Sequence, residues 1–87
     1  MKWLTGLRDQ KAIARIQIRI DRLALGNPGD VRPVGSGISE MRIDYGPGYR
    51  VYFSQRESEI VILLCGGDKT TQKSDIENAK RVNNGVQ

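Results

Sequence analysis

The chain contains no histidine and a single cysteine, Cys65. The absence of histidine removes the commonest general acid–base of enzymes. With only one cysteine present, no plausible zinc site is left. Cys65 cannot form an internal disulfide and has no CxxC partner. Because it lies in an apolar segment, we interpret it as a small buried hydrophobe, the alternative being a reactive thiol. We therefore expect no metal and no cofactor.

Long apolar runs are also missing, since nothing approaches the ~20 residues of a membrane span. The first residues, MKWLT, are not followed by the apolar region of a secretory signal, so a cytoplasmic location is expected. At 87 residues the chain is expected to form a single domain, 1–87. A domain of this size has room for one modest core and none for a deep cofactor pocket.

Positive charge is in moderate excess. Fourteen Lys and Arg residues against ten Asp and Glu give a net charge of +4 and a pI near 9.6. This balance suggests a polyanionic partner such as nucleic acid. The alternative is a solvated basic surface with no such role.

Two helices are predicted before residue 30. Residues 3–7 resemble a short helical turn. Over residues 10–25 the apolar side chains recur at three- and four-residue steps, which places them on one helical face. Asp9 is a good N-cap for this second helix. Gly26 at the C′ position and Pro28 shortly after it are expected to end the helix.

Strands are predicted in the middle of the chain. Residues 31–37 are rich in Gly and Pro and are expected to form a loop. Residues 39–45 and 49–54 alternate in polarity, as in half-buried strands, with a turn at 46–48 between them. Residues 60–65 are apolar throughout, which predicts a central strand buried on both faces.

A final helix is expected to begin with Thr70 or Thr71 as its cap and to run to about Val82. The order is then two helices, three strands in hairpin succession and one helix. This order predicts an α+β fold with a twisted antiparallel sheet of three or more strands.

Six polar side chains are predicted to converge on one shallow basin of a bare sheet: Glu40, Arg42, Arg50, Tyr52, Lys69 and Lys73. The first four become cross-strand neighbours if their strands pair through the 46–48 turn. The two lysines follow the last strand, on the opening turn of the final helix.

These groups suit ribonuclease chemistry, in which the RNA 2′-hydroxyl attacks the adjacent phosphorus. Arg50, Lys69 and Arg42 can bind phosphate and stabilise the developing charge. A proton could be handled by Tyr52 or by Lys73, with Glu40 as a further candidate. Replacing Arg50 by Ala should then abolish activity while leaving the fold intact.

A purely structural interpretation stands beside the catalytic one. Arg42, between Glu40 and Asp44, would then belong to an exposed ion network of little energetic value. Tyr52 would pack on the outer sheet face, and the lysines would be solvated. Lysine at a helix start is, however, mildly unfavourable, which hints at another purpose.

The ordered set of segments WLTGLRD (3–9), SEMRI (39–43), GPGYRVY (46–52) and LLCGGDK (63–69) resembles a known family. It is similar to the addiction-module killer proteins, the phage Gp49-like, HigB-type branch of the RelE/ParE toxin superfamily. The resemblance covers nearly the whole chain and implies a RelE-like fold. It also implies a cognate HigA-like antitoxin with a helix-turn-helix domain, through which alone the complex would contact operator DNA.

The resemblance also implies targets and site residues. RelE- and HigB-type members cut mRNA on the ribosome without a metal, whereas ParE-type members poison DNA gyrase. By carry-over from the nuclease branch, Arg50 and Lys69 bind or activate the scissile phosphate, followed by Arg42 and Lys73. Together with Tyr52, Arg50 and Lys69 make up the expected catalytic set.

Two departures from the family pattern stand out. Such toxins usually open with a strand before the Trp-Leu segment, and no such strand is seen here. A second copy or an antitoxin segment could fill the resulting open sheet edge by strand addition. The C-terminal tyrosine or histidine that serves as general base in better-known members is also missing. Catalysis would then need Tyr52, a lysine, or alignment of the 2′-hydroxyl by the ribosome.

Three hypotheses follow. The favoured one is a ribosome-dependent mRNA endonuclease that inhibits translation and is held off by an antitoxin. The second is a non-enzymatic gyrase inhibitor, motivated by the missing base. The third is an inactive, truncated toxin that only binds its antitoxin.

Overall fold

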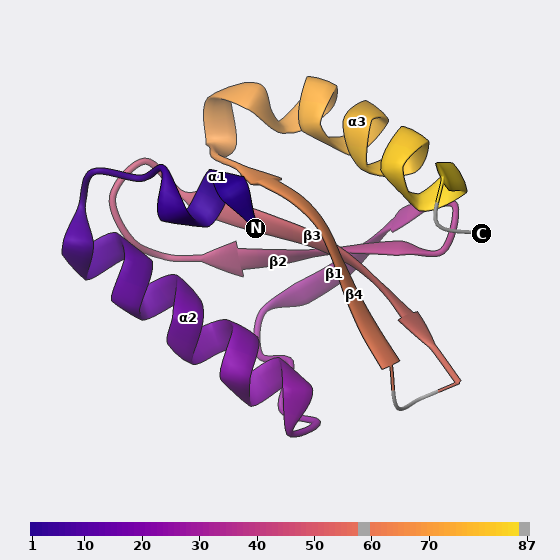
Figure 1. The fold of residues 1–87 in the computed structure, drawn as a ribbon, viewed down its shortest axis with the longest axis horizontal. Coiled ribbons are helices and arrows are strands. Elements are labelled where there is room, and N and C mark those ends of the chain that lie inside the picture. The colour runs from indigo at the N-terminus through magenta and orange to yellow at the C-terminus, as the bar shows by residue number, and fades with distance from the viewer. Residues whose placement is uncertain (58–59, 86–87) are drawn as a thin grey trace.

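The computed structural model describes residues 1–57 and 60–85. Within them, an antiparallel sheet of four strands in the order β1-β2-β3-β4 forms the middle layer. Helices α1 and α2 lie on one face of this sheet and α3 lies on the other (Figure 1). The elements are α1 Lys2–Thr5, α2 Gln10–Ala24, β1 Val31–Gly35, β2 Ile38–Ile43, β3 Tyr49–Arg56, β4 Ile60–Gly67, a 3-10 turn Lys69–Thr71, and α3 Gln72–Gly85. The predicted α+β class is confirmed.

Helix α2 begins and ends where the sequence predicts. The Asp9 carboxylate accepts hydrogen bonds from the backbone N–H groups of Lys11, at 3.0 Å, and Ala12, at 3.2 Å. These bonds satisfy two of the donors that a helix start leaves open. At the other end Gly26 adopts φ 88°, a left-handed conformation that glycine enters without strain.

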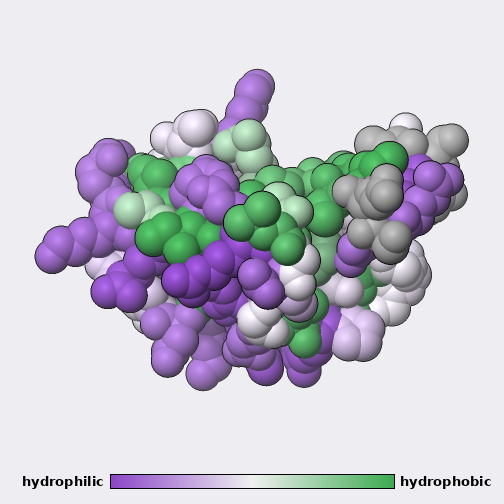
Figure 2. Space-filling model, turned by 90° about the horizontal axis from the view of Figure 1, so that it is seen from below, coloured by the Kyte–Doolittle hydropathy of each residue, from purple (hydrophilic) through white to green (hydrophobic). Residues whose placement is uncertain are grey.

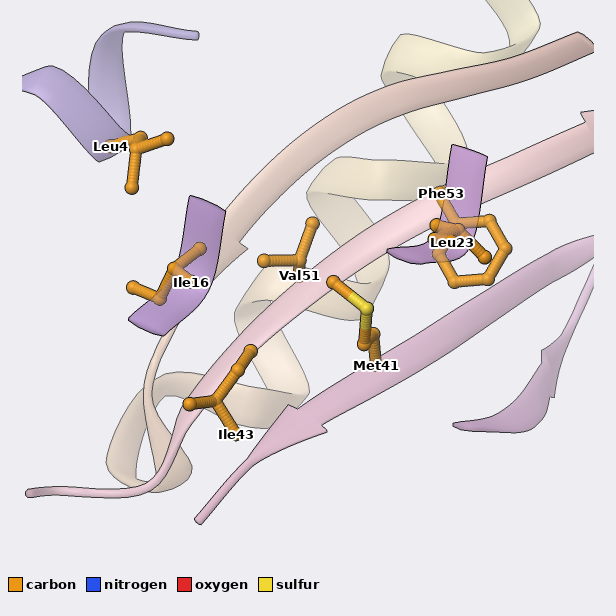
Figure 3. Packing of buried hydrophobic residues seen from close by; sticks show 7 residues of the cluster. All are labelled: Leu4, Ile16, Leu23, Met41, Ile43, Val51 and Phe53. Atoms are coloured by element: carbon orange, nitrogen blue, oxygen red, sulfur yellow. The ribbon is translucent and has the colours of Figure 1, made fainter. Parts of the chain in front are cut away.

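The main core lies between the sheet and the two N-terminal helices. Its buried members come from α1, α2, β2 and β3 (Figure 3): Leu4, Ile16, Leu23, Met41, Ile43, Val51 and Phe53. Burying each large apolar side chain contributes roughly 1.5–3 kcal/mol. This core anchors one face of β2 and β3, so the alternate side chains of the same strands must point to the opposite face.

Helix α3 covers that opposite face, so the expectation of a bare sheet is wrong. Ala79 of α3 packs with Ile38, Tyr52 and Leu64 in a second buried cluster. Ile76 and Val82 complete the helix's apolar stripe. The alternation of β2 and β3 therefore separates two covered faces rather than an inside from an outside.

The segment expected to be a loop is strand β1, paired with β2 from Val31↔Met41 to Gly35↔Ile38. Its glycine and proline content favoured a loop. Yet β1 lies at the sheet edge, where Pro33 removes no hydrogen bond from the sheet interior. Gly35, Ser36 and Gly37 all have positive φ and form the tight turn into β2.

Strand β4 is an edge strand, not the central strand that was expected. Apolar side chains occur on both faces of β4 because each face is covered over part of its length. Leu64 packs toward α3, whereas Gly66 lies directly beneath the Trp3 ring of α1. Burial on both faces and a central position in the sheet are thus separate properties.

The final helix is capped one turn earlier than expected. The Asp68 carboxylate accepts the Thr70 N–H at 2.8 Å, and Thr71 Oγ1 accepts the Asp68 N–H at 3.3 Å, a reciprocal capping box. The helix also runs past Val82 to Gly85. Within this last turn, buried Asn83 donates from Nδ2 to the Ser36 carbonyl oxygen at 3.5 Å.

Candidate functional site

Glu40 of β2 is the centre of a polar network beneath α3, with 0% of its surface exposed. Four side chains donate to its carboxylate: Arg50 Nη1 at 2.9 Å, Arg32 Nε at 3.0 Å, Tyr52 Oη at 3.0 Å and Gln72 Nε2 at 2.8 Å. They come from β3, β1 and the first residue of α3. A buried charge is tolerable only when it is paired and fully hydrogen-bonded in this way.

The network holds Glu40 in its charged form. Burial alone would raise the pKa of the carboxyl group. Hydrogen bonds from Gln72, Tyr52 and Arg32, together with the charge of Arg50, outweigh burial, so the pKa of Glu40 lies below its ordinary value. A carboxylate fixed in this state orients its partners and is poorly suited to accepting a proton.

Tyr52, expected to be catalytic, lies wholly inside this network and is 0% exposed. Burial, followed by its hydrogen bond to Glu40, raises the pKa of the Tyr52 phenol well above its usual range. A phenol that is inaccessible and hard to ionise is unsuited to act as a base at neutral pH. The placement argues for Tyr52 as a structural donor.

Arg50 joins the buried network to the surface. Its side chain is 12% exposed, and its register partner across the hairpin is Arg42. Both line an open hollow of about 530 Å³ at the end of the β2–β3 hairpin. The expected cross-strand proximity of Arg42 and Arg50 is confirmed. Because Arg50 is tied to Glu40, its replacement by Ala would also disturb the fold, unlike the sequence-based expectation.

Lys69 lines the same hollow, from the 3-10 turn that leads into α3. It follows β4, whose last residue Gly67 pairs with Arg50. The Lys69 stem runs beside Gly48, where an added Cβ would lie 3.4 Å from the lysine Cβ. Gly48 has φ 80°, so the turn needs glycine there for its conformation. Lys69, Arg42 and Arg50 therefore line one concave surface, together with the carboxylates Asp30 and Asp44.

Arg42 is held at the rim by Asp30. Its Nη2 lies 2.7 Å and its Nε 3.2 Å from Asp30 Oδ1. The pair lowers the pKa of Asp30 and raises that of Arg42, in each case chiefly through this hydrogen bond. Arg19 of α2 donates to the Arg42 carbonyl oxygen at 2.7 Å and so fixes the backbone behind it.

Lys73 does not lie in this hollow. It lines a separate shallow depression on α3 with Thr70, Thr71, Ser74 and Glu77. The structure therefore brings Arg42, Arg50 and Lys69 together and places Lys73 apart from them.

Other residues at the site carried no clear sequence signal. Tyr49 lines the hollow, and its ring packs edge-on against Trp3 with centroids 6.1 Å apart. Gln72 of α3 and Arg32 of β1 complete the Glu40 network. The alternation of polar and apolar residues along β2 and β3 does not predict how these two elements pack against them. Of the side chains around Glu40, Tyr52 and Arg50 could be read from the hairpin register.

Cys65 is partly buried near α3, and its Sγ donates to the Asp75 carbonyl oxygen at 3.4 Å. Burial, with the Asp75 charge, raises the pKa of its thiol to about 11. In the part of the chain described, no cluster of three or more His, Cys, Asp or Glu residues could hold a metal ion. None of the described helices has the length and hydrophobicity needed to span a bilayer.

Comparison with known proteins gives two matches. The model of the family described as "Phage derived protein Gp49-like (DUF891)" matches residues 2–84. An uncharacterized protein of Haemophilus influenzae is 54% identical over 78 residues, which cover 90% of this chain and 79% of the relative. No solved structure matches the chain. The chain therefore belongs to the phage-derived Gp49-like family, which is associated with the toxins of toxin–antitoxin systems.

Proposed function

We propose that the protein is the toxin of a type II toxin–antitoxin system, with a RelE-like fold, and that it cleaves mRNA on the ribosome. The observation that supports this most directly is the hollow lined by Arg42, Arg50 and Lys69. Three cations outnumber the two carboxylates of this concave surface, Asp30 and Asp44, and they suit a phosphate of an RNA backbone. The net charge of +4 favours approach of the same polyanion.

In the proposed reaction the 2′-oxygen of one nucleotide attacks the adjacent phosphorus. The P–O5′ bond breaks, which leaves a 2′,3′-cyclic phosphate and a 5′-hydroxyl. The 2′-hydroxyl loses a proton and the departing O5′ gains one. Arg50 and Lys69 stabilise the negative charge that grows on the phosphoryl oxygens, and such electrostatic stabilisation usually contributes most to the rate enhancement. Arg42 binds the neighbouring backbone.

In this proposed reaction, the network beneath α3 holds the Arg50 guanidinium in place. Glu40 fixes the guanidinium from behind, so little reorganisation is needed when a phosphate arrives. Among the described residues, Arg50 Nε is buried without a hydrogen-bond partner. Such an uncompensated donor calls for an explanation that a purely structural ion pair does not supply. Tyr49, rather than Tyr52, presents an aromatic side chain to the hollow, on which a nucleobase can stack.

A non-enzymatic toxin of the gyrase-inhibiting kind is the second candidate. It is favoured by the engagement of both Tyr52 and Glu40 in the buried network, which removes two candidate proton carriers. Under the nuclease proposal the ribosome must then help by aligning the 2′-hydroxyl. In either case a HigA-like antitoxin is the proposed partner.

Lys69 and Lys73 offer a matched test, because both are exposed lysines near the start of α3 and only Lys69 lines the hollow. We expect induced wild-type protein to arrest growth and to leave transcript breaks at the ribosomal A site. Lys69→Ala should lower cleavage about 100-fold or more, as for loss of one charge-stabilising group. Lys73→Ala should behave like wild type.

Mapping of transcript 5′ ends, combined in the same cells with a reporter of the SOS response to DNA damage, distinguishes the possible outcomes. Equal cleavage by both variants would remove Lys69 from the site. DNA damage without transcript breaks would replace the nuclease by the gyrase-type toxin. The absence of any growth arrest would leave only the antitoxin-binding role.

A further inference from the structure

Helix α2 carries a second regular series of side chains on the side turned away from the core. Its members follow one another at alternating steps of four and three residues, which is the spacing of a coiled-coil seam. All of them are exposed, and we call them the outer stripe of α2: Lys11, Arg15, Ile18, Arg22 and Leu25. Ile18 is 49% exposed and Leu25, the C-cap, is 80% exposed. The stripe therefore presents aliphatic and positively charged side chains together.

The cations of the outer stripe have no carboxylate partner. Within residues 1–57 and 60–85, neither Lys11 nor the two arginines of the stripe form an ion pair. Asp21, the one acidic residue of α2, instead accepts a hydrogen bond from Gln17 Nε2 at 2.9 Å. Helix α2 lies along the lower side of the molecule in Figure 1, and in the view from below apolar areas lie among hydrophilic ones (Figure 2). The surface thus combines exposed apolar groups with unpaired positive charge.

A second hollow, of about 320 Å³, adjoins the stripe. Its lining combines three arginines of α2 with one carboxylate, Asp44, and with apolar surface from Ile18, Ile43 and Tyr45. The Arg15 guanidinium lies over the Tyr45 ring, 4.6 Å from its centroid, so an attractive cation–π contact holds it in place. Such a hollow suits an apolar side chain that enters beside a carboxylate.

We propose that the outer stripe and the second hollow bind an acidic amphipathic helix of a partner protein. The inference rests on the proposed function only for the source of that helix, the antitoxin. A partner helix has the same rise of about 1.5 Å per residue as α2. Apolar side chains seven residues apart on it can therefore meet Ile18 and Leu25, while carboxylates at the same interval meet Arg15 and Arg22.

Other occupants fit this surface less well. An RNA strand uses cations and aromatic faces and would leave the aliphatic Ile18 and Leu25 without a matching partner. A second copy of α2 would set unpaired cations against cations. A β-strand repeats its side chains every two residues, which does not match steps of four and three. Charge and spacing together favour an acidic helix.

The position of the second hollow gives the docked helix a consequence. The two hollows share Ile43 and Asp44 in their linings. A helix seated in the second hollow therefore lies next to the surface of Arg42, Arg50 and Lys69, and its carboxylates repel an approaching phosphate. Binding of the helix should lower RNA affinity without any segment of it entering the first hollow.

A synthetic peptide tests the surface on the purified full chain. The peptide has three heptads with Leu at a and d and Glu at e and g, and its control has the same composition in scrambled order. In isothermal titration calorimetry we expect the heptad peptide to bind about 10-fold or more tighter than the control, and more weakly as salt is raised. Methyl NMR signals of Ile18 and Leu25 should shift on binding, whereas that of Ile60 should not. Equal affinity for both peptides, or shifts away from α2, would overturn the proposal. The absence of nuclease activity would leave this result untouched, because neither ribosome nor cleavage enters the measurement.

Two isoleucines of similar exposure provide matched variants. Ile18 on α2 is 49% exposed and Ile60 on β4 is 52% exposed. Ile18→Gln removes an apolar group without changing charge and should weaken peptide binding about 10-fold, whereas Ile60→Gln should bind like wild type. Arg22→Gln should weaken binding and reduce its salt dependence.

The same variants decide between a helix and RNA as the occupant. With a short labelled RNA in place of the peptide, Ile18→Gln should retain wild-type affinity, since it keeps every cation. If Ile18→Gln weakened RNA binding as much as peptide binding, or if Arg22→Gln weakened RNA binding alone, RNA would replace the helix as the ligand of α2 and the proposal would fall.

Discussion

One polar face of the β2–β3 hairpin is divided into two regions of opposite character. Under α3, Glu40 and Tyr52 have no exposed surface and hydrogen-bond each other. At the hairpin end, Arg42 and Lys69 border an open hollow. Arg50 belongs to both regions. The difference teaches that alternation along a strand assigns a side chain to a face, while the element packed on that face decides whether it supports the structure or meets a ligand.

Glu40→Gln should have the largest effect on stability, because it removes the charge at the centre of the buried network. The amide leaves two guanidinium groups, one of them nearly buried, without a counter-charge. Removing one partner of a buried ion pair typically costs about 3–5 kcal/mol. We expect a loss of this order in the free energy of unfolding, measured by urea denaturation. Glu77→Gln, the same change on the exposed face of α3, is the control and should be nearly neutral; equal midpoints for the two variants would contradict the buried network.

Tyr52→Phe tests whether Tyr52 belongs to the buried structural region or to the ligand-binding region. Loss of one buried hydrogen bond to a carboxylate should cost about 1–2 kcal/mol, while toxicity stays at the wild-type level in cells that retain folded protein. Tyr45→Phe removes a surface hydroxyl that donates to Asp9 at 3.3 Å and serves as control. A stable, folded Tyr52→Phe protein without toxicity would return Tyr52 to the catalytic set.

The pH dependence of stability gives a smaller and more specific signal. Because the pKa of Glu40 is lower in the folded protein than in the unfolded chain, the unfolded state binds more protons in acid. The network's contribution is therefore complete above the ordinary glutamate pKa and is lost as pH falls through the lowered value. The stability gap between wild type and Glu40→Gln should shrink over that window. Taking the difference cancels the acid titration of Asp30 and Asp68; a gap that stays constant with pH would mean that Glu40 is not held ionised.

Much of the fold could be predicted from the sequence because local patterns determine it. The Asp9 cap, the apolar face of α2 and the turn at 46–48 are each encoded within a few residues. The cover that α3 provides and the edge position of β4 depend on contacts between distant segments, so local pattern could not reveal them. A glycine- and proline-rich stretch resembles a loop unless its partner strand is known, and for this reason β1 was missed.

The candidate site, like the fold, could be predicted only where local pattern determines it. The register Glu40↔Tyr52 and Arg42↔Arg50 follows from one hairpin, so that grouping could be predicted. The depth of each side chain could not, because it depends on Gln72 and the rest of α3 arriving from the other end of the chain. Lys69 reaches the hollow through its packing beside Gly48, whereas Lys73, one helical turn later, lies in another depression.

Asp30→Asn should have the smallest effect and tests the open region alone. The Asp30–Arg42 pair is solvent-exposed, and exposed pairs contribute little to stability, so the urea midpoint should not move measurably. Removing the carboxylate from the rim of the hollow frees the Arg42 guanidinium for a phosphate and raises the local positive potential. RNA affinity at low salt, measured by fluorescence anisotropy with a short labelled strand, should rise modestly, and the gain should fade as salt is added. Weaker binding by Asp30→Asn would mean that Asp30 positions Arg42 for the ligand instead of competing with it. A large loss of stability would mean that the Asp30–Arg42 pair supports the fold, as the buried network around Glu40 does.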